Sequence, residues 1–300
     1  MLSGAKPPAE VTIDRSVVTA LLQEQHGDLA HLPLREVAEG WDNKLFRLGD
    51  DLVARFPRRA AAAVLIENEQ RWLPLLSPRL PVPIPSPLRV GRPGAGFPWS
   101  WSVVPWLPGQ SALMAPFGDV ATLAVALGAF LRTLHQPAPR DAPHNPWRSI
   151  PLSARETTLR EHLRQVEDLV DNKAILAVWE RARSTPEWSG QRVWIHGDLH
   201  PGNVLVSGGH LSAVIDFGDL AAGDPATDLS LAWMLLPSSV RQTLLTSADG
   251  QNGSLDGHTV MRARGWALAL GLAHLANSEN DDLLGALGHR TIDSVLRDGP

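Results

Sequence analysis

The most informative part of the chain is HGDLHPGNVLVSGGHLSAVIDFGD, residues 196–219, which follows the short apolar segment VWI. Two apolar runs within it, NVLV and LSAVI, flank the sequence SGGH, and glycine pairs of this kind are typical of tight turns. The pattern therefore predicts a β-hairpin formed by residues 203–206 and 211–215. Such a hairpin would bring the polar side chains at its two ends close together.

Three polar residues of this stretch carry the predicted chemistry. Asp198, Asn203 and Asp216 supply two carboxylates and an amide oxygen, which are hard ligands of the kind that Mg²⁺ prefers. Asp198 and Asn203 are five residues apart, as in the catalytic loop H-R-D-x-x-x-x-N, and the sequence from Asp216 reads D-F-G. The spacing predicts that Asp198 orients an attacking hydroxyl and accepts its proton, while Asn203 and Asp216 hold Mg²⁺.

The composition excludes several classes of protein. The chain has 300 residues, of which 44% are hydrophobic, and a formal net charge of −5. These values argue against disorder and against nucleic acid as a partner. Because cysteine is absent, disulfides and thiolate metal sites are excluded. No secretory signal or membrane-spanning apolar run is visible, so we expect a cytoplasmic protein that does not bind a membrane.

The period of the apolar residues changes along the chain and predicts an α+β fold with two lobes. A small N-terminal β-sheet lobe with a helix, residues 1–103, is followed by a hinge, 104–109, and a mostly helical lobe, 110–300. The larger lobe contains the catalytic loop, 196–203, and the metal-binding segment, 216–218. The segments expected to be helical are 11–25, 58–76, 117–135, 154–183, 226–236, 238–247, 257–277 and 281–296.

The two motifs together resemble the aminoglycoside phosphotransferase superfamily, which includes aminoglycoside, macrolide, choline and homoserine kinases. HGDLHPGN and VIDFGD carry the resemblance, with GDPATDLS after them, and it covers nearly the whole chain. It implies a protein-kinase-like fold and transfer of the γ-phosphoryl group of ATP, or of GTP, with Mg²⁺ as cofactor. The acceptor would be a hydroxyl of a small molecule, either antibiotic-like or a metabolite.

The resemblance also implies a phosphate-binding residue in the segment LVARFPRR. Arg55 stands where kinases usually carry a lysine, and no lysine is nearby in the sequence. Arginine binds phosphate oxygens through a bidentate fork rather than as a point charge. Counting back from the proline of LPVP makes Glu69 the implied acidic partner of Arg55 and leaves Glu67 as a solvated helix residue.

Further nucleotide-binding residues are implied by position. EGWDNKLFRLG, which contains Gly40 and Asn43, occupies the place of the loop that covers the nucleotide, although taken alone it reads as an ordinary hairpin turn. SVVPWLPG would be the hinge, with backbone groups of Val104 and Trp106 near the purine base. Pro105 between them has no N–H to donate.

Structural roles are predicted for three other polar residues. His196 and Asp228 would support the catalytic loop rather than take part in the chemistry. His196 and His200 have the spacing of a helical zinc pair, but the following Pro201-Gly202 disfavours a helix there. Asp224 precedes a proline and is predicted to be a helix N-cap.

The sequence does not decide the identity of the acceptor substrate. Glu279, Asp281 and Asp282 could meet a cationic sugar, but they are better explained as acids at a helix N-terminus. Trp233 and Trp266 could line a pocket for a large apolar ligand, although core packing is the commoner reason for such residues.

Two other functions compete with the phosphotransferase. Arg55 would suit a catalytically weak or inactive nucleotide-binding module with a kinase fold. A protein kinase is disfavoured because no long activation segment follows DFG and because Gly197 replaces the arginine of H-R-D. The oligomeric state is not predicted.

Overall fold

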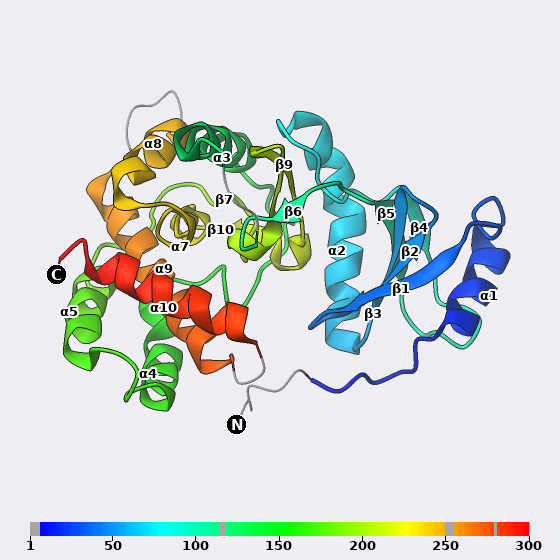
Figure 1. The fold of residues 1–300 in the computed structure, drawn as a ribbon, viewed down its shortest axis with the longest axis horizontal. Coiled ribbons are helices and arrows are strands. Elements are labelled where there is room, and N and C mark those ends of the chain that lie inside the picture. The colour runs from blue at the N-terminus through cyan, green and yellow to red at the C-terminus, as the bar shows by residue number, and fades with distance from the viewer. Residues whose placement is uncertain (1–6, 115–117, 250–254, 279–280, 300) are drawn as a thin grey trace. The chain divides into compact units, whose positions relative to one another are not determined.

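The computed structural model describes residues 7–114, 118–249, 255–278 and 281–299 (Figure 1). The chain divides into two compact units that are not contiguous in sequence. The sheet unit contains Lys6–Pro108 and Ala213–Gly218, and the helical unit contains Gly109–Ser212 and Asp219–Pro300. The predicted α+β class is confirmed.

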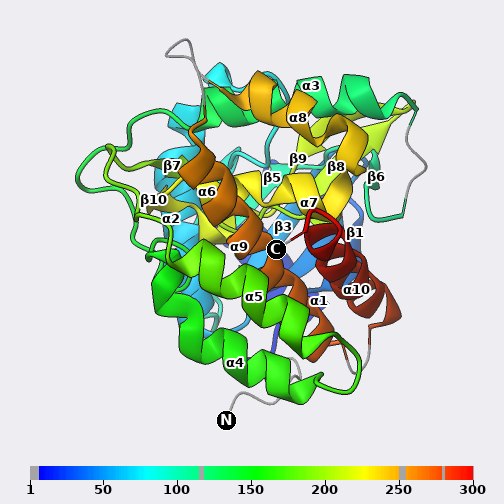
Figure 2. The same cartoon turned by 90° about the vertical axis from the view of Figure 1, so that its left-hand side faces the viewer.

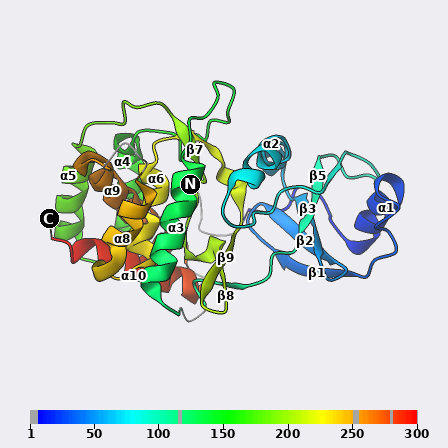
Figure 3. The same cartoon turned by 90° about the horizontal axis from the view of Figure 1, so that it is seen from above.

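The sheet unit is built on an antiparallel sheet with the strand order β1-β2-β3-β5-β4. One helix lies on each face of this sheet, α1 on one side and α2 on the other (Figures 1 and 3). The bounds of these elements are α1 Arg15–Gln25, β1 Leu34–Glu39, β2 Asn43–Leu48, β3 Leu52–Pro57, α2 Ala60–Leu76, β4 Arg89–Gly91 and β5 Trp101–Pro105.

Alternation along the strands separates the two faces of the sheet. Phe46, Ala54 and Phe56 pack with Trp101 in the core beneath α1, where the rings of Phe56 and Trp101 stack at 4.9 Å. The residues between them point toward α2, because successive side chains of a strand face opposite ways. Arg55 is one of these, so the strand period places it on the α2 side.

The Pro/Gly-rich connector after α2 holds one strand that the sequence did not predict. Arg89–Gly91 forms β4, which pairs with Trp101–Val103 at the edge of the sheet. An edge position suits a proline-rich segment, because only one side of the strand has to supply ladder hydrogen bonds.

The helical unit is centred on α9. This helix is buried nearly all round and packs against α4, α5, α6 and α10 (Figure 2). The helices of the unit are α3 Val120–Leu134, α4 Glu156–Gln165, α5 Asn172–Arg183, α6 Ala226–Leu229, α7 Leu231–Leu235, α8 Ser238–Ala248, α9 Gly257–Ala276 and α10 Asp282–Leu296. Its strands are β6 Gln110–Ser111, β7 Val193–Ile195, β8 Val204–Ser207 and β10 Ala221–Gly223, and β9 His210–Val214 crosses into the sheet unit.

Two predicted helices are interrupted. The segment 154–183 contains a 3₁₀ turn and then two helices, α4 and α5, because Asp171 starts a new helix by accepting a hydrogen bond from Ala174 N at 3.0 Å. The segment 226–236 is divided into α6 and α7 at Ser230, whose hydroxyl donates to the carbonyl of Thr227 at 2.6 Å.

None of the helices in the described residues combines the length and the apolar character that a membrane span requires.

Candidate active site

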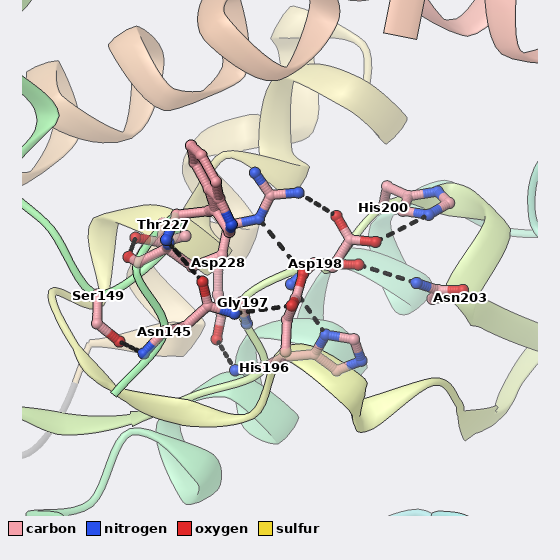
Figure 4. Close-up of polar contacts among 12 residues, drawn as sticks. Asn145, Ser149, His196, Gly197, Asp198, His200, Asn203, Thr227 and Asp228 are labelled. Atoms are coloured by element: carbon pink, nitrogen blue, oxygen red, sulfur yellow. Dashed lines mark hydrogen bonds and ion pairs between the residues drawn. The ribbon is translucent and has the colours of Figure 1, made fainter. Parts of the chain in front are cut away.

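The predicted catalytic loop, 196–203, connects β7 to β8 in the helical unit (Figure 4). Asn203 ends the 3₁₀ turn Pro201–Asn203, so the strand that follows begins at Val204, one residue later than predicted. The hairpin itself is confirmed. Gly208 and Gly209 connect its strands with φ values of 58° and 82°, the backbone that a two-residue hairpin turn of this type requires.

Asp228 of α6 holds the start of this loop. Its carboxylate accepts hydrogen bonds from the backbone N–H groups of His196 at 2.8 Å and Gly197 at 2.9 Å (Figure 4). The same carboxylate lies 3.0 Å from Nε2 of His135 in the segment after α3. Asp228 is completely buried, and these partners compensate the loss of its hydration.

Gly197 has a backbone that another residue would adopt only with strain. Its φ is +85°, and a Cβ atom there would lie 2.5 Å from the carbonyl oxygen of Asp219. The glycine that replaces the kinase arginine is therefore required by the local backbone. The buried ring of His196 is adjacent, and its Nδ1 accepts a hydrogen bond from Asp198 N at 3.3 Å.

Asp198 is surrounded by basic groups of the helical unit. Nη2 of Arg148 donates to its Oδ1 at 2.8 Å, and Nε2 of His200 lies 3.7 Å from its Oδ2. Burial alone would raise the pKa of this carboxyl, but the charges of Arg148 and His200 hold the pKa well below its usual range. Asp198 is consequently a carboxylate at neutral pH.

Asn203 is fixed by the loop that it closes. Its Nδ2 donates to the carbonyl oxygen of Asp198 at 2.9 Å (Figure 4). This bond uses the amide nitrogen, which leaves the amide oxygen as the atom that a metal ion would meet. The structure thus brings Asp198 and Asn203 together.

The sequence did not single out Arg148. It comes from the segment before the 3₁₀ turn Leu152–Arg155, where Asn145 Oδ1 accepts from Arg148 N at 3.0 Å. Asn145 also donates to Asp219 at 2.7 Å, and Arg148 Nε lies 3.6 Å from the same carboxylate. No motif marks this segment, because its partners in the loop are about fifty residues distant in sequence.

A second histidine lies behind His200. The ring of His274, in the last turn of α9, is 5.4 Å from the ring of His200. Burial lowers the pKa of His274 to about 3, with His200 acting in the same direction. His274 is therefore neutral at pH 7.

In the sheet unit, Arg55 and Glu69 form a buried bidentate pair. The guanidinium donates to the two carboxylate oxygens of Glu69 at 2.8 and 3.1 Å. Burial raises the pKa of Glu69 to about 7, with Arg55 acting in the opposite direction. Glu67 lies outside this pair and accepts a hydrogen bond from Ser100 at the surface. The structure thus brings together the two residues that the family pattern implied.

Asp216 lies close to this pair. Its Oδ1 is 3.8 Å from Nη2 of Arg55, and its side chain is 59% exposed. Its φ of +62° is uncommon for a residue other than glycine. Such backbone strain concentrates at functional positions, where the surrounding structure maintains it.

The loop expected to cover a nucleotide is a tight turn. Gly40 N donates to Asn43 O at 2.8 Å, and Arg58 donates to the carbonyls of Gly40 and Trp41 at 3.4 and 3.0 Å. The side-chain oxygen of Asn43 is buried and has no hydrogen-bond partner among the described residues.

In the predicted hinge, the backbone N–H of Trp106 already has a partner. Its backbone N–H donates to Asp51 O at 2.7 Å, and Arg47 stacks on its indole at 3.8 Å, so this N–H is not available to a base. Val104 of β5 pairs with Val53 of β3, so its backbone groups face the same neighbouring segment as the N–H of Trp106. Because backbone groups alternate along a strand, the C=O of Pro105 faces away from β3.

Asn203 of the helical unit and Asp216 of the sheet unit each carry an oxygen atom of the type that Mg²⁺ binds. Asn203 and Asp216 offer an amide oxygen and an accessible carboxylate, and Mg²⁺ usually takes one or two protein carboxylates together with phosphate oxygens. Among the described residues, no group of three His, Cys, Asp or Glu side chains is arranged to hold a metal ion.

The other residues singled out in the sequence take part in ion pairs, helix caps or core packing. Asp224 accepts a hydrogen bond from Ala226 N at 3.0 Å, but the N-cap of α6 is Pro225, one residue later than predicted. Asp224 also pairs with buried Arg262 at 2.6 Å. Asp281 caps α10, whereas Glu279 lies outside the described residues. Trp233 and Trp266 are both buried in the helical core.

A family model described as the phosphotransferase enzyme family matches residues 33–264. The chain belongs to this phosphotransferase family. The predictions of the family and of a phosphotransferase enzyme are thus confirmed. The search among curated proteins found no match.

Solved structures of similar fold cover nearly the whole phosphotransferase chain. The GDP and kanamycin complex of APH(2")-IIia shares 20% identity at a TM-score of 0.71, covering 94% of this chain and 99% of that one. Macrolide 2'-phosphotransferase MphH from Brachybacterium faecium shares 23% at 0.63, covering 95% and 98%. The streptomycin–ATP complex of APH(2")-IIa shares 16% at 0.58, covering 94% and 97%. These similarities confirm the predicted kinase-like fold.

Proposed function

We propose that this phosphotransferase transfers the γ-phosphoryl group of ATP or GTP to a hydroxyl of a small molecule in the cytoplasm. The observation that carries the proposal is the loop of Asp198 and Asn203, held by Asp228 and Gly197 in the geometry described above. Relatives of the same fold were solved with GDP and kanamycin or with ATP and streptomycin, which supports a nucleotide and a small-molecule acceptor.

Asp198 would orient the acceptor hydroxyl and receive its proton. Phosphoryl transfer passes through a loose transition state, so a catalytic carboxylate contributes chiefly by positioning the nucleophile. A carboxylate with a lowered pKa suits this role, because it stays ionised and accepts a hydrogen bond from the hydroxyl.

Arg55 would hold the non-transferred phosphates, with Glu69 fixing the plane of its guanidinium. Asn203 and Asp216 would hold Mg²⁺, which neutralises charge on the phosphates when it is bound. The ion pair of Arg55 and Glu69 favours an active enzyme over an inactive nucleotide-binding module, since the position that usually carries lysine still holds a cation fixed by a buried acid.

The nucleobase would be recognised by the hinge, 104–109, which we propose as the connection between the two lobes, 1–103 and 110–300. The C=O of Pro105 lies beyond the residues of β5 that pair with β4 and would supply an acceptor, with the N–H of Leu107 as the proposed donor. Together with the covering turn at Gly40 and Asn43, these groups would complete the nucleotide site.

The test is Asp198→Asn, which keeps the size of the side chain and removes its charge. Phosphoryl transfer is expected to fall by about 10² to 10⁴ while nucleotide binding is retained, measured by product formation and by calorimetric titration of nucleotide. Aminoglycosides, macrolides and small amino alcohols form the first acceptor panel.

The matched control is Asp171→Asn at the N-cap of α5, a position where asparagine caps a helix as well as aspartate does. It is expected to leave transfer unchanged. Full transfer by Asp198→Asn, or the absence of any acceptor in the panel together with unchanged slow nucleotide hydrolysis, would refute the proposed function and favour the nucleotide-binding module.

A further inference from the structure

Arg148 lies on a turn that closes without its guanidinium. Asn145 Oδ1 accepts hydrogen bonds from the backbone N–H groups of Trp147 and Arg148 at 2.8 and 3.0 Å (Figure 4). Ser149 N donates to Asn145 O at 2.9 Å, and Ser149 Oγ accepts from Asn145 N at 3.1 Å. An asparagine side chain that bonds the backbone of the following residues stabilises a turn by itself. The turn therefore depends on Asn145 and Ser149, and the side chain of Arg148 is available for another role.

The backbone of this turn is bound to the segments that surround the catalytic loop. Asn145 Nδ2 donates to Asp219 Oδ1 at 2.7 Å, and Thr227 Oγ1 of α6 donates to Arg148 O at 3.4 Å. Asp228, the next residue of α6, holds the start of the catalytic loop through the hydrogen bonds described above. The backbone of Arg148 and the catalytic loop are thus attached to the same helix, within the helical unit.

The guanidinium of Arg148 contacts Asp198 more closely than it contacts Asp219. Its Nη2 donates to Asp198 Oδ1 at 2.8 Å, whereas its Nε lies 3.6 Å from Asp219 Oδ2, beyond hydrogen-bond distance. The side chain of Arg148 is 16% exposed, so water competes little for this bond. Charge-assisted hydrogen bonds of this kind are short and strong. Arg148 therefore restricts the rotation of the Asp198 carboxylate.

The two oxygens of the Asp198 carboxylate consequently differ in their partners. Oδ1 accepts from Arg148, whereas no hydrogen bond from the described residues ends on Oδ2, and Nε2 of His200 is 3.7 Å away from it. An ionised carboxylate accepts hydrogen bonds through both oxygens. The Asp198 side chain is 32% exposed, so a donor from solution can reach it. Oδ2 thus keeps its capacity to accept a hydrogen bond from a hydroxyl.

We propose that Arg148 is a positioning residue of this phosphotransferase, which holds Oδ1 of Asp198 so that Oδ2 receives the acceptor hydroxyl in a single orientation. The inference rests on the proposed function and deepens it by assigning the atom that receives the proton. The hydroxyl oxygen forms its bond to the γ-phosphorus as the bond to the leaving nucleoside diphosphate breaks, and the proton of the hydroxyl goes to Oδ2.

Arg148→Met tests the contact, because methionine fills a similar space without a charge or a donor. We expect kcat for phosphoryl transfer to fall by about 10- to 100-fold, since a misplaced catalytic group loses rate rather than affinity. The Kd of the nucleotide, measured by calorimetric titration, is expected to stay unchanged. Arg148→Lys keeps a charged donor without the planar fork, so it is expected to retain more transfer than the methionine variant. The lysine variant serves in each experiment if the methionine variant does not fold.

Arg192→Met is the matched control. Arg192 supports the same turn, since its Nη2 donates to Ser149 O at 2.9 Å, and its bonds in the described residues end on Ser149 and His144 rather than on Asp198. This variant is expected to keep the wild-type kcat. In Arg148→Ala, added guanidinium ion is expected to restore part of the transfer relative to sodium chloride at the same ionic strength, and it is not expected to restore transfer in Asp198→Asn.

Wild-type kcat in Arg148→Met would overturn the inference. Equal losses in Arg148→Met and Arg192→Met, without rescue of Arg148→Ala by guanidinium, would also overturn it, because they would assign the effect to the turn alone.

The orientation of Asp198 is also measured without any acceptor, in crystal structures of the wild type and of Arg148→Met. We expect one carboxylate orientation in the wild type, with Oδ1 toward Arg148, and a rotated or divided carboxylate in the variant. An unchanged carboxylate in the variant would overturn the inference. If the carboxylate moves as expected but the wild type phosphorylates no acceptor, the proposed function fails and the positioning of Asp198 by Arg148 stands.

Discussion

Glu69 and Glu67 lie two positions apart on α2, yet they differ completely in environment. Glu69 is buried in a bidentate pair with Arg55, whereas Glu67 accepts one hydrogen bond from Ser100 at the surface. The family pattern selected the correct glutamate from the sequence alone, because the distance from the helix to the following LPVP segment is a matter of counting. The same counting could not find Arg148, whose partner Asp198 comes from a distant segment.

Glu69→Ala tests the buried pair. It is expected to lower the free energy of unfolding by about 3–5 kcal/mol, because it leaves the buried Arg55 guanidinium without its partner. It is also expected to raise KM for the nucleotide. Denaturant unfolding and steady-state kinetics measure the two effects. Glu67→Ala on the same helix is the control and is expected to change stability by less than about 0.5 kcal/mol. Similar losses in both variants would contradict the assigned environments.

At the scale of elements, the sequence pattern predicts the hairpin and most helices. It does not predict the breaks that divide two of the expected helices. The alternation and the glycine pair predict the strands after Asn203, and the pattern of apolar residues predicts the long helices. The break between α4 and α5 depends on the cap at Asp171, which has no Glu or Gln three residues later to complete a capping box. The edge strand β4 depends on an available neighbour, β5, rather than on its own residues.

Gly197→Ala tests the conformation of the catalytic loop. It is expected to destabilise the protein by about 1–3 kcal/mol and to reduce phosphoryl transfer, because positive φ strain is combined with a clash against Asp219 O. Gly208→Ala is the matched control. Its φ is also positive, at +58°, but a Cβ atom there meets open space. It is expected to keep transfer and to cost about 1–2 kcal/mol at most. A fully active Gly197→Ala enzyme would show that the loop tolerates a different backbone.

At the scale of the whole molecule, the free energy of unfolding depends on pH because basic side chains with lowered pKa values are buried in the folded protein. His274 is the clearest case, since its folded pKa of about 3 lies below the ordinary value of 6.5. The unfolded chain binds a proton at His274 between these two values and the folded chain does not. The free energy of unfolding therefore falls as the pH decreases through this window, and the contribution of His274 is fully present above it.

His274→Asn is expected to make the dependence of stability on pH shallower by about one proton between roughly pH 6 and 4. Denaturant midpoints at several pH values measure the slope. The same substitution at the exposed His289 of α10 controls for the loss of a histidine. An unchanged slope in the His274 variant would mean that its ring takes up a proton in the folded protein.

The segment Ala213–Gly218 belongs to the sheet unit, although the chain on both sides of it belongs to the helical unit. The backbone N–H of Val214 donates to Pro83 O at 3.2 Å, and the same segment delivers Asp216 to Arg55. A single cut in the chain therefore cannot separate the two units without taking Asp216 away from Arg55. A fragment that ends at Pro108 would lack Ala213–Gly218, the second segment of the sheet unit. An exchange of the sheet unit between relatives would therefore have to include both segments.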